Sequence, residues 1–142
     1  MTVMGNLSLS QDFQVENNNY PRILIVDNDN DAIIFFKTCL QDIGFCVTAF
    51  NNPFKALSNY KPRYYDLIII DVRMPRMNGF ELFEKIKKLD TNARVCFITA
   101  FEEYYSSLKE QYPNLDADCF ISKPVSAEDL IKLVKSKILS SD

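Results

Sequence analysis

Short apolar runs recur along the chain, and a longer segment of mixed polarity follows each of them. Runs of four to six residues that are rich in β-branched side chains are typical of strands buried on both faces, as in a parallel sheet. Leu67–Ile70 has this pattern most clearly, with three consecutive isoleucines. The predicted strands are Arg22–Val26, Phe45–Phe50, Leu67–Ile70, Arg94–Thr99 and Asp118–Ile121.

The segments between these runs have the spacing of amphipathic helices. In Asp31–Ile43 the residues Ile33, Phe36, Leu40 and Ile43 recur at intervals of three and four, and Gly44 follows as a helix stop. The other predicted helices are Phe54–Tyr60, Phe80–Leu89, Glu102–Tyr112 and a last one that begins near Ser126. Five repeats of strand then helix, joined by right-handed crossovers, predict an α/β fold with a doubly wound parallel sheet between helix layers.

Composition narrows the class of protein. The 142 residues are 47% hydrophobic and 25% charged with a net charge of −3, which suits one globular domain and no nucleic-acid partner. No apolar run approaches the roughly 20 residues that cross a membrane, and no secretory signal is evident, so we expect a cytoplasmic protein without membrane contact. Residues 1–20 are rich in Ser, Gln and Asn and are predicted to form a flexible tail before a domain at 21–142.

The cysteines and the lack of histidine exclude several chemistries. Cys39, Cys46, Cys96 and Cys119 are scattered through apolar segments, without a C-x-x-C pair, and are predicted to be buried, reduced thiols. The sequence contains no histidine, which excludes Ser-His and Cys-His catalysis as well as histidine phosphotransfer by this chain itself.

Polar side chains stand where four of the predicted strands end. These residues are Asp27 and Asn28, Asp71, Thr99, and Lys123. The carboxyl ends of parallel strands share one edge of an open α/β sheet, where ligands bind. Each residue also has a plain structural explanation. Asp71 could be a solvated strand end, and the cluster that begins at Asp27 could cap the next helix, which would explain Asn30 and Asp31 better than Asp27.

Together these residue types suit phosphoryl transfer. Clustered carboxylates repel one another unless a cation lies between them, and carboxylate, amide and carbonyl oxygens are ligands that suit Mg²⁺. Lys123 adds a positive charge and Thr99 a hydrogen-bond donor, both suited to phosphoryl oxygens. An Asp carboxylate can itself be the nucleophile and form an acyl phosphate.

Four motifs in this order make the chain resemble the receiver domain of two-component response regulators, the family that includes the chemotaxis regulator of bacterial flagella. They are I-L-I-V-D at Asp27, D-V-R-M-P-R-M-N-G-F-E-L at Asp71, Thr99-Ala100, and Lys123-Pro124. The resemblance covers about residues 21–139. It implies a flavodoxin-like strand order 2-1-3-4-5 and makes Asp71 the phosphoacceptor. It also implies that Lys123 neutralises the phosphoryl group and that Thr99 bonds to it.

The resemblance also implies a metal site and a conformational switch. Asp27, Asn28, Asp71 and the backbone carbonyl of Arg73 would bind Mg²⁺. Asn28 departs from the family, which usually has a second acidic residue there, so weaker metal binding is expected. Phe120 matches the aromatic position that swings inward when Thr99 moves, although an ordinary core phenylalanine is the alternative interpretation.

The predicted function is therefore signal transfer rather than enzymatic turnover, apart from self-phosphorylation and autodephosphorylation. A histidine kinase or histidine phosphotransfer protein would phosphorylate Asp71, and a downstream protein partner would respond, or the chain would be a phosphorelay intermediate. No output domain is expected. Three alternatives stay open: a degenerate receiver that works without phosphorylation, a flavin-binding module of the same strand order, and a phosphatase with an aspartyl nucleophile, which the D-x-D at Asp27–Asp29 resembles.

Overall fold

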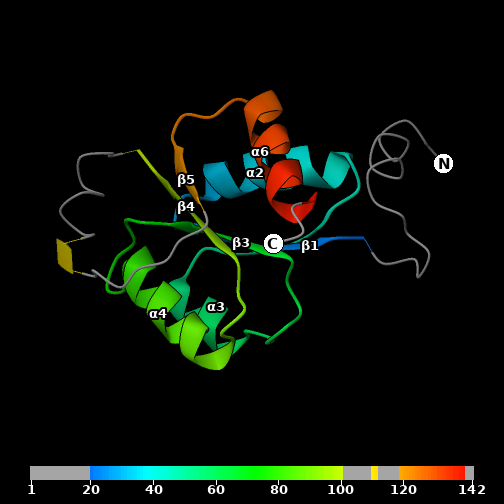
Figure 1. The fold of residues 1–142 in the computed structure, drawn as a ribbon. Coiled ribbons are helices and arrows are strands. Elements are labelled where there is room, and N and C mark those ends of the chain that lie inside the picture. Colours follow the sequence, from blue (N-terminus) through cyan, green and yellow to red (C-terminus); the bar gives the residue numbers. More distant parts are fainter. Residues whose placement is uncertain (1–19, 101–109, 112–118, 140–142) are drawn as a thin grey trace.

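The computed structural model of the protein describes residues 20–100, 110–111 and 119–139 (Figure 1). The strands are β1 (Arg22–Val26), β2 (Cys46–Phe50), β3 (Leu67–Asp71), β4 (Val95–Thr99) and β5 (Cys119–Ser122). The helices are α2 (Asn30–Asp42), α3 (Pro53–Ser58), α4 (Gly79–Leu89) and α6 (Ala127–Leu139). Within these ranges no helix has the length and apolar character needed to span a membrane.

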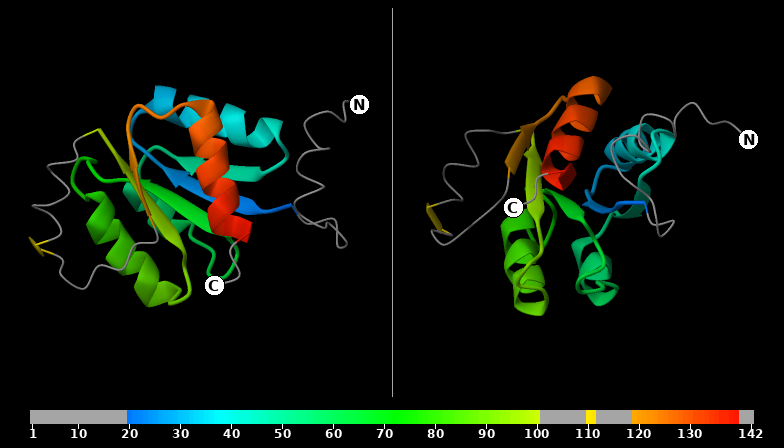
Figure 2. Two further views of the ribbon diagram at one scale, coloured as in Figure 1. Left: turned by 45° about the horizontal axis from the view of Figure 1, so that its top comes forward. Right: turned by 45° about the vertical axis from the view of Figure 1, so that its right-hand side comes forward.

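All strands belong to one parallel sheet of order β2-β1-β3-β4-β5, which confirms the predicted fold. Helices α2 and α6 cover one face of the sheet, and α3 and α4 cover the other (Figures 1 and 2). Strand β1 lies between β2 and β3, so the chain moves toward one edge of the sheet after β1 and toward the other edge after β2. The carboxyl ends of β1 and β3 are therefore adjacent at the point where the direction of winding reverses. Ligand sites of open α/β sheets lie at this point.

The two faces of the sheet have separate hydrophobic cores, because successive side chains of a strand point to opposite faces. Leu24 and Ile70 pack with Phe80 and Phe97 on the side of α3 and α4. The other face packs against α2 and α6, and the side chains there include Ile23, Ile25, Leu67, Ile69, Phe36 and Leu40. Burial on both faces explains why the strands are apolar throughout rather than alternating.

Asparagine and aspartate side chains begin the helices that follow β1, β2 and β3. Asp29 accepts a hydrogen bond from the Asp31 N–H at the start of α2, and Asn52 caps α3. Asn78 and Glu81 form a reciprocal capping box at the start of α4. The residue that caps α2 is therefore Asp29 rather than Asn30 or Asp31, because the Asp29 side chain reaches forward to the free N–H of Asp31.

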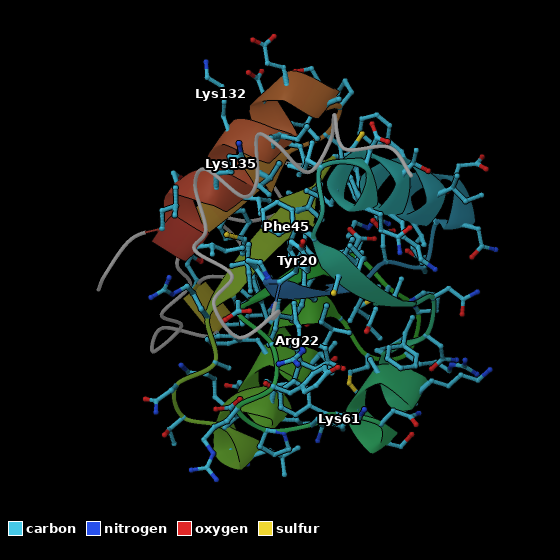
Figure 3. All side chains as sticks on the ribbon, turned by 90° about the vertical axis from the view of Figure 1, so that its right-hand side faces the viewer. Tyr20, Arg22, Phe45, Lys61, Lys132 and Lys135 are labelled. Carbon is cyan, nitrogen blue, oxygen red and sulfur yellow. The ribbon has the colours of Figure 1, made fainter. Side chains whose placement is uncertain are left out.

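The opposite end of the sheet carries an aromatic and cationic cluster, seen in the view that faces Arg22 and Lys61 (Figure 3). The Arg22 guanidinium lies 4.4 Å and the Lys61 ammonium 4.8 Å from the centre of the Tyr64 ring. Nearby, the carboxylate of Asp90, at the end of α4, accepts hydrogen bonds from the Tyr60 hydroxyl and the Arg63 N–H. These contacts tie the α3–β3 connection to α4.

The prediction that the cysteines are buried, reduced thiols is wrong for Cys96 and Cys46, and Cys39 is a free thiol that is only partly buried. Cys96 is disulfide-bonded, and Cys46 is exposed at the start of the edge strand β2. An apolar run does not reveal which strand lies at the sheet edge, nor that the register places Cys96 across from Cys119. The predicted tail at 1–20 and the helix Glu102–Tyr112 lie outside the described residues, apart from Tyr20, Glu110 and Gln111.

Candidate functional site

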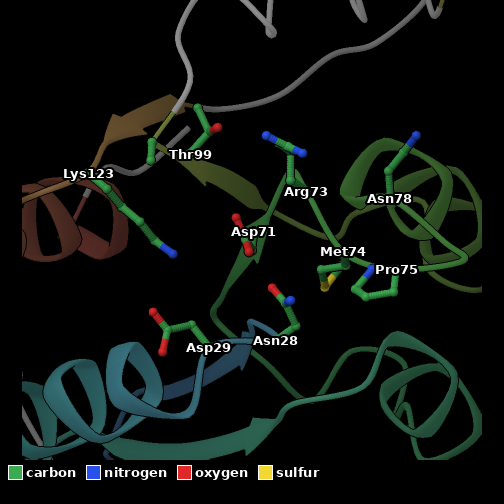
Figure 4. Close-up of a pocket in the computed structure, with 10 residues that line it drawn as sticks. Asn28, Asp29, Asp71, Arg73, Met74, Pro75, Asn78, Thr99 and Lys123 are labelled. Atoms are coloured by element: carbon green, nitrogen blue, oxygen red, sulfur yellow. The ribbon is translucent and has the colours of Figure 1, made fainter.

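A pocket of about 580 Å³ opens at the carboxyl edge of the sheet, above the ends of β1, β3, β4 and β5 (Figure 4). Four connections contribute to its wall: the turn after β1, the loop between β3 and α4, the residue after β4, and the turn after β5. Its lining comprises Asn28, Asp29, Asp71, Arg73, Met74, Pro75, Asn78, Thr99, Ala100 and Lys123.

Asp71 lies near the centre of this pocket because it is the last residue of the central strand β3. Hydrogen bonds continue beyond the strand, from the Val72 N–H to the Ile98 carbonyl at 3.0 Å and from the Gly79 N–H to the Val72 carbonyl at 2.8 Å. These bonds hold both the backbone after Asp71 and the first turn of α4. Asp71 is only 6% exposed, so its carboxylate faces the pocket rather than bulk solvent.

Asp27 is fully buried beneath the pocket at the end of β1. Its Oδ1 accepts a hydrogen bond from the Asp29 N–H at 2.9 Å, and its Oδ2 lies 3.0 Å from the Lys123 Nζ in an ion pair. Within the described part of the chain, Oδ2 has no hydrogen bond of good geometry besides that ion pair. A buried carboxylate oxygen held by charge alone is a natural ligand for a cation.

Thr99 and Lys123 come from the neighbouring strands β4 and β5. The Lys123 N–H donates to the Thr99 carbonyl at 2.8 Å, which aligns the two strand ends. Thr99 is 1% exposed, and the Lys123 side chain is 21% exposed as it reaches across the pocket. The ammonium pairs with Asp27, whereas the sequence had suggested a position opposite Asp71. Figure 4 shows this ammonium between Thr99 and the β1 turn.

Asn28 and Arg73 lie on the side of the pocket that faces the α4 connection. The hydrogen-bond network assigns Asn28 the orientation in which its amide nitrogen donates to the Arg73 carbonyl at 3.2 Å and to Asp71 Oδ2 at 2.9 Å. Asn28 therefore contacts, through one atom, two of the oxygens that the resemblance assigns to Mg²⁺.

The electrostatics of the pocket suit a cation. Burial and then the negative charge of Asp27 raise the pKa of Asp71 to about 7, while Lys123 and a backbone N–H partly oppose that rise. Two carboxylates with one ammonium leave the pocket one positive charge short of balance when both are ionised. A divalent cation would favour the ionised form of Asp71.

The residues present fit a hard divalent cation such as Mg²⁺. Such ions prefer oxygen ligands and keep several waters, so they need only one or two protein carboxylates. Asp27, Asp71 and the Arg73 carbonyl supply three oxygens around one space. Among the described residues no three His, Cys, Asp or Glu side chains gather at one point, so the remaining ligands would be neutral oxygens.

Phe120 lies in β5 below the pocket and packs in the core. Its ring centre is 5.3 Å from that of Phe97 and 6.2 Å from that of Phe80, on the α3 and α4 side of the sheet. It is partly buried, so its ring packs against the core in this conformation while part of the side chain stays accessible to solvent. Its predicted movement stays a prediction.

Five further residues line the pocket without a site role predicted from the sequence: Asp29, Met74, Pro75, Asn78 and Ala100. Met74 is buried and Pro75 is exposed in the β3–α4 loop, and Asn78 both lines the pocket and caps α4. The N-G pair before an apolar helical pattern was the available signal for this role of Asn78. Met74 and Pro75 belong to the motif that begins at Asp71, but the motif assigns them no role in the pocket, because loop residues enter a pocket through the path of the backbone.

Comparison with known proteins agrees with this geometry. A sequence model of the response regulator receiver domain matches residues 23–135. The response regulator receiver protein CpdR of Brucella abortus is 29% identical over 120 residues, covering 84% of this chain and 98% of that protein. Some relatives are longer. The probable transcriptional regulator ycf29 of Porphyra purpurea is 32% identical, and the match spans 82% of this chain but 56% of that protein.

Solved structures have the same architecture. A CheY-like receiver domain protein from Methanospirillum hungatei superimposes with a TM-score of 0.72 at 29% identity, covering 84% of this chain and 94% of that one. The response regulator TrrA of Thermotoga maritima, solved in complex with Mg²⁺ and BeF, has a TM-score of 0.70 at 29% identity, covering 82% and 98%.

Proposed function

The chain belongs to the receiver domain family of response regulators, and we propose that it accepts a phosphoryl group on Asp71 and signals by a change of conformation. The family is a signalling module rather than a classical enzyme, which disfavours the flavin-binding and phosphatase alternatives. The observation that carries the proposal is the convergence of Asp71, Lys123 and Thr99, from three strand ends, on one pocket.

Asp71 is suited to be the nucleophile. One carboxylate oxygen attacks the phosphorus, and the bond from phosphorus to the donor's nitrogen or oxygen breaks as the new P–O bond forms. Asp71 is the last residue of a buried strand, which fixes the position of its carboxylate. Little entropy is therefore lost when the carboxylate is oriented for attack. The pocket excludes most water from the carboxylate, which strengthens each electrostatic contact with the incoming group.

The cations of the pocket would neutralise the phosphoryl oxygens. Lys123 Nζ is already held beside the carboxylates by Asp27 and can bond to a phosphoryl oxygen from there. Mg²⁺, when bound by Asp27, Asp71, Asn28 and the Arg73 carbonyl, would supply further charge for the transferring group. The Mg²⁺ complex of TrrA supports this assignment by relationship.

Thr99 would couple phosphorylation of Asp71 to a change of conformation. Its hydroxyl would donate to a phosphoryl oxygen, and its carbonyl already accepts a hydrogen bond from the Lys123 N–H, so movement of Thr99 would affect both β4 and β5. The partly buried Phe120 is two strand positions from that bond and can change its packing as β5 adjusts. A partner protein would read the altered surface near these strand ends.

The partners follow from this chemistry. The chain has no histidine, so the phosphoryl group must come from a histidine kinase, from a histidine phosphotransfer protein or from a small phosphodonor. The downstream target would be a protein that binds the phosphorylated form more tightly. Transfer of the group onward, as a phosphorelay intermediate, uses the same site in reverse.

Incubation with acetyl phosphate and Mg²⁺, followed by intact-mass measurement and peptide mapping, tests the proposal. We expect a phosphate adduct on the peptide that contains Asp71 and its loss when a chelator replaces Mg²⁺. An adduct on another peptide would contradict the assignment of Asp71.

A receiver that signals without phosphorylation is the second candidate, and Asn28 is the observation that favours it. An amide in place of the usual acid removes one negative charge from the metal pocket, which weakens attraction for Mg²⁺. Absence of both Mg²⁺ binding and phosphorylation in the native protein would support this candidate.

A further inference from the structure

The side chain of Asn28 makes an unusual pair of contacts for a residue placed at a metal site. Its amide nitrogen donates to Asp71 Oδ2 at 2.9 Å and to the Arg73 carbonyl at 3.2 Å. Both acceptors are oxygens that the proposed function gives to Mg²⁺. The polar hydrogens of Asn28, rather than its oxygen, are thus directed at the ligand oxygens.

These two hydrogen bonds partly replace the stabilising effect of a bound cation on the oxygens. Oxygen atoms gathered around a point repel one another unless a positive charge or a donor lies between them. An amide NH₂ group has two donor hydrogens, which is enough for both acceptors. An ionised aspartate has acceptors only and could not bridge these two oxygens in this way.

The other buried carboxylate is satisfied in a parallel manner. Asp27 bonds through Oδ1 to the Asp29 N–H at 2.9 Å and pairs through Oδ2 with the Lys123 Nζ at 3.0 Å. The pocket therefore gives positive partners to both carboxylates from its own side chains. Asn28 is exposed, so its side chain can rotate toward solvent without disturbing the core.

We propose that Asn28 is a hydrogen-bond clasp that closes the cation site of the metal-free protein and opens as the cation enters. The inference rests on the proposed function of this pocket as a Mg²⁺ site. It makes Asn28 a positioning residue that stabilises the metal-free form and competes with the cation. Its amide oxygen can still become a ligand after the side chain has rotated.

The clasp predicts that loss of Asn28 changes the metal-free and the metal-bound protein in opposite ways. Asn28→Ala removes two hydrogen bonds from the metal-free form and leaves Asp71 Oδ2 without that donor, so this form should melt at a lower temperature. The same variant no longer has to break these bonds when Mg²⁺ binds. Its Mg²⁺ affinity should equal or exceed the native value, by up to about tenfold.

The experiment is a Mg²⁺ titration of the full chain, followed by tyrosine fluorescence, with thermal melting in chelator and in saturating Mg²⁺. Asn30→Ala is the matched control, because Asn30 lies in the same turn but accepts its hydrogen bond from the Asn51 side chain, away from Asp71. Asn28→Asp, which removes the donor and adds a negative charge, should melt lowest in chelator and bind Mg²⁺ most tightly.

The expected result is a larger rise of melting temperature with Mg²⁺ in Asn28→Ala than in the native protein, and a native-like rise in Asn30→Ala. Mg²⁺ binding that is weaker in Asn28→Ala by tenfold or more, with unchanged melting in chelator, would overturn the clasp and leave Asn28 as a simple ligand. That result would not affect the proposed function. Absence of Mg²⁺ binding in all these forms would overturn the metal site itself, and the clasp with it.

Discussion

At the scale of single residues, the proposed function makes Asp71 the nucleophile and Lys123 the neutralising cation, and the environments of the two residues differ. Asp71 is almost completely buried, and burial together with Asp27 raises its pKa to about 7. Lys123 has a side chain that is 21% exposed and forms an ion pair with Asp27 from the turn after β5. A nucleophile and its neutralising cation are thereby held by different strands, so each can be tested without removing the other.

Asp71→Asn should abolish the phosphate adduct formed with acetyl phosphate and Mg²⁺, because an amide oxygen is not a nucleophile toward phosphorus under these conditions. Binding of beryllofluoride, which mimics the acyl phosphate, should be lost as well. The measurement is intact mass for the adduct and ¹⁹F NMR for beryllofluoride. A variant that still gains the adduct would show that another residue is the acceptor.

Lys123→Ala should slow phosphorylation of Asp71 by about ten- to hundredfold, because the phosphoryl oxygens lose a neutralising contact. It also leaves the fully buried Asp27 without its ion-pair partner, which should lower the free energy of unfolding by about 1–3 kcal/mol. Rates come from time courses of intact mass, and stability from urea unfolding. Lys132→Ala, on the exposed side of α6, is the control and should match the native protein in both.

At the scale of elements, close packing of the start of α4 against the end of β3 fixes the wall of the pocket. Gly79 begins α4, and a Cβ at this position would lie 2.4 Å from the Asp71 carbonyl oxygen and 3.0 Å from both Ile70 Cγ2 and Val72 Cα. The close approach requires glycine, since the nearest atoms are backbone and cannot move aside as a flexible side chain could.

Gly79→Ala should therefore destabilise the fold by about 1–3 kcal/mol and displace the Asp71 backbone. Urea unfolding measures the first effect, and the rate of phosphorylation measures the second. Lys88→Ala, an exposed position in the same helix, should change the free energy of unfolding by less than about 0.5 kcal/mol. Equal stability of Gly79→Ala and native protein would mean that α4 can shift away from β3 at little cost.

The other end of α4 is held by Asp90. Burial by itself raises the pKa of this carboxyl group, but the hydrogen bonds from the Arg63 N–H and the Tyr60 hydroxyl outweigh it, and the pKa lies below the usual 3.8. Because the folded-state pKa is the lower one, Asp90 stabilises the fold above the unfolded-state pKa and loses this contribution as the pH falls through the folded-state pKa.

Asp90→Asn should accordingly lower the free energy of unfolding by about 1–2 kcal/mol at pH 7. The difference from the native protein should shrink as the pH falls from the unfolded-state pKa through the lower folded-state pKa of Asp90, because the native carboxylate then also becomes neutral. Urea unfolding at pH 7 and near pH 3 measures both values. Tyr60→Phe removes one of the two donors and should have the smaller effect. A pH-independent difference would show that the charge of Asp90 is unimportant.

At the scale of the whole molecule, Thr99 is the residue that we propose couples the pocket to the surface. It is buried at the end of β4, its carbonyl bonds to the Lys123 N–H, and the adjoining strand carries Phe120. A change that begins at Asp71 can therefore reach two strands at the edge of the sheet without disturbing β1 or β2.

Thr99→Ala should leave phosphorylation of Asp71 possible but reduce the structural response to it, because the hydroxyl that follows the phosphoryl group is absent. In the native protein, beryllofluoride with Mg²⁺ should shift the amide NMR signals of β4 and β5, including that of Phe120. The variant should bind beryllofluoride with much smaller shifts in these strands. Native-like shifts would contradict the coupling role. Thr91→Ala, outside the pocket, is the control.

Local patterns were sufficient to predict the layers of the fold and the polar residues at the carboxyl ends of its strands. Fully apolar strands occur because helices cover both faces of the sheet, and right-handed crossovers then bring Asp27, Asp71, Thr99 and Lys123 to one edge. Strand order followed from the resemblance to receiver domains, and the structure confirms it. The layers depend on the period of the sequence, and the edge that carries the polar residues depends on which residues end the strands.

Contacts between residues far apart in the chain required the folded structure. The ion pair of Lys123 with Asp27 and the amide of Asn28 directed at Asp71 depend on distances of a few ångströms between different loops. The disulfide at Cys96 depends in the same way on its surroundings in the sheet. Strand register, loop path and side-chain rotation set such distances, and these result from packing of the whole domain rather than from any local period.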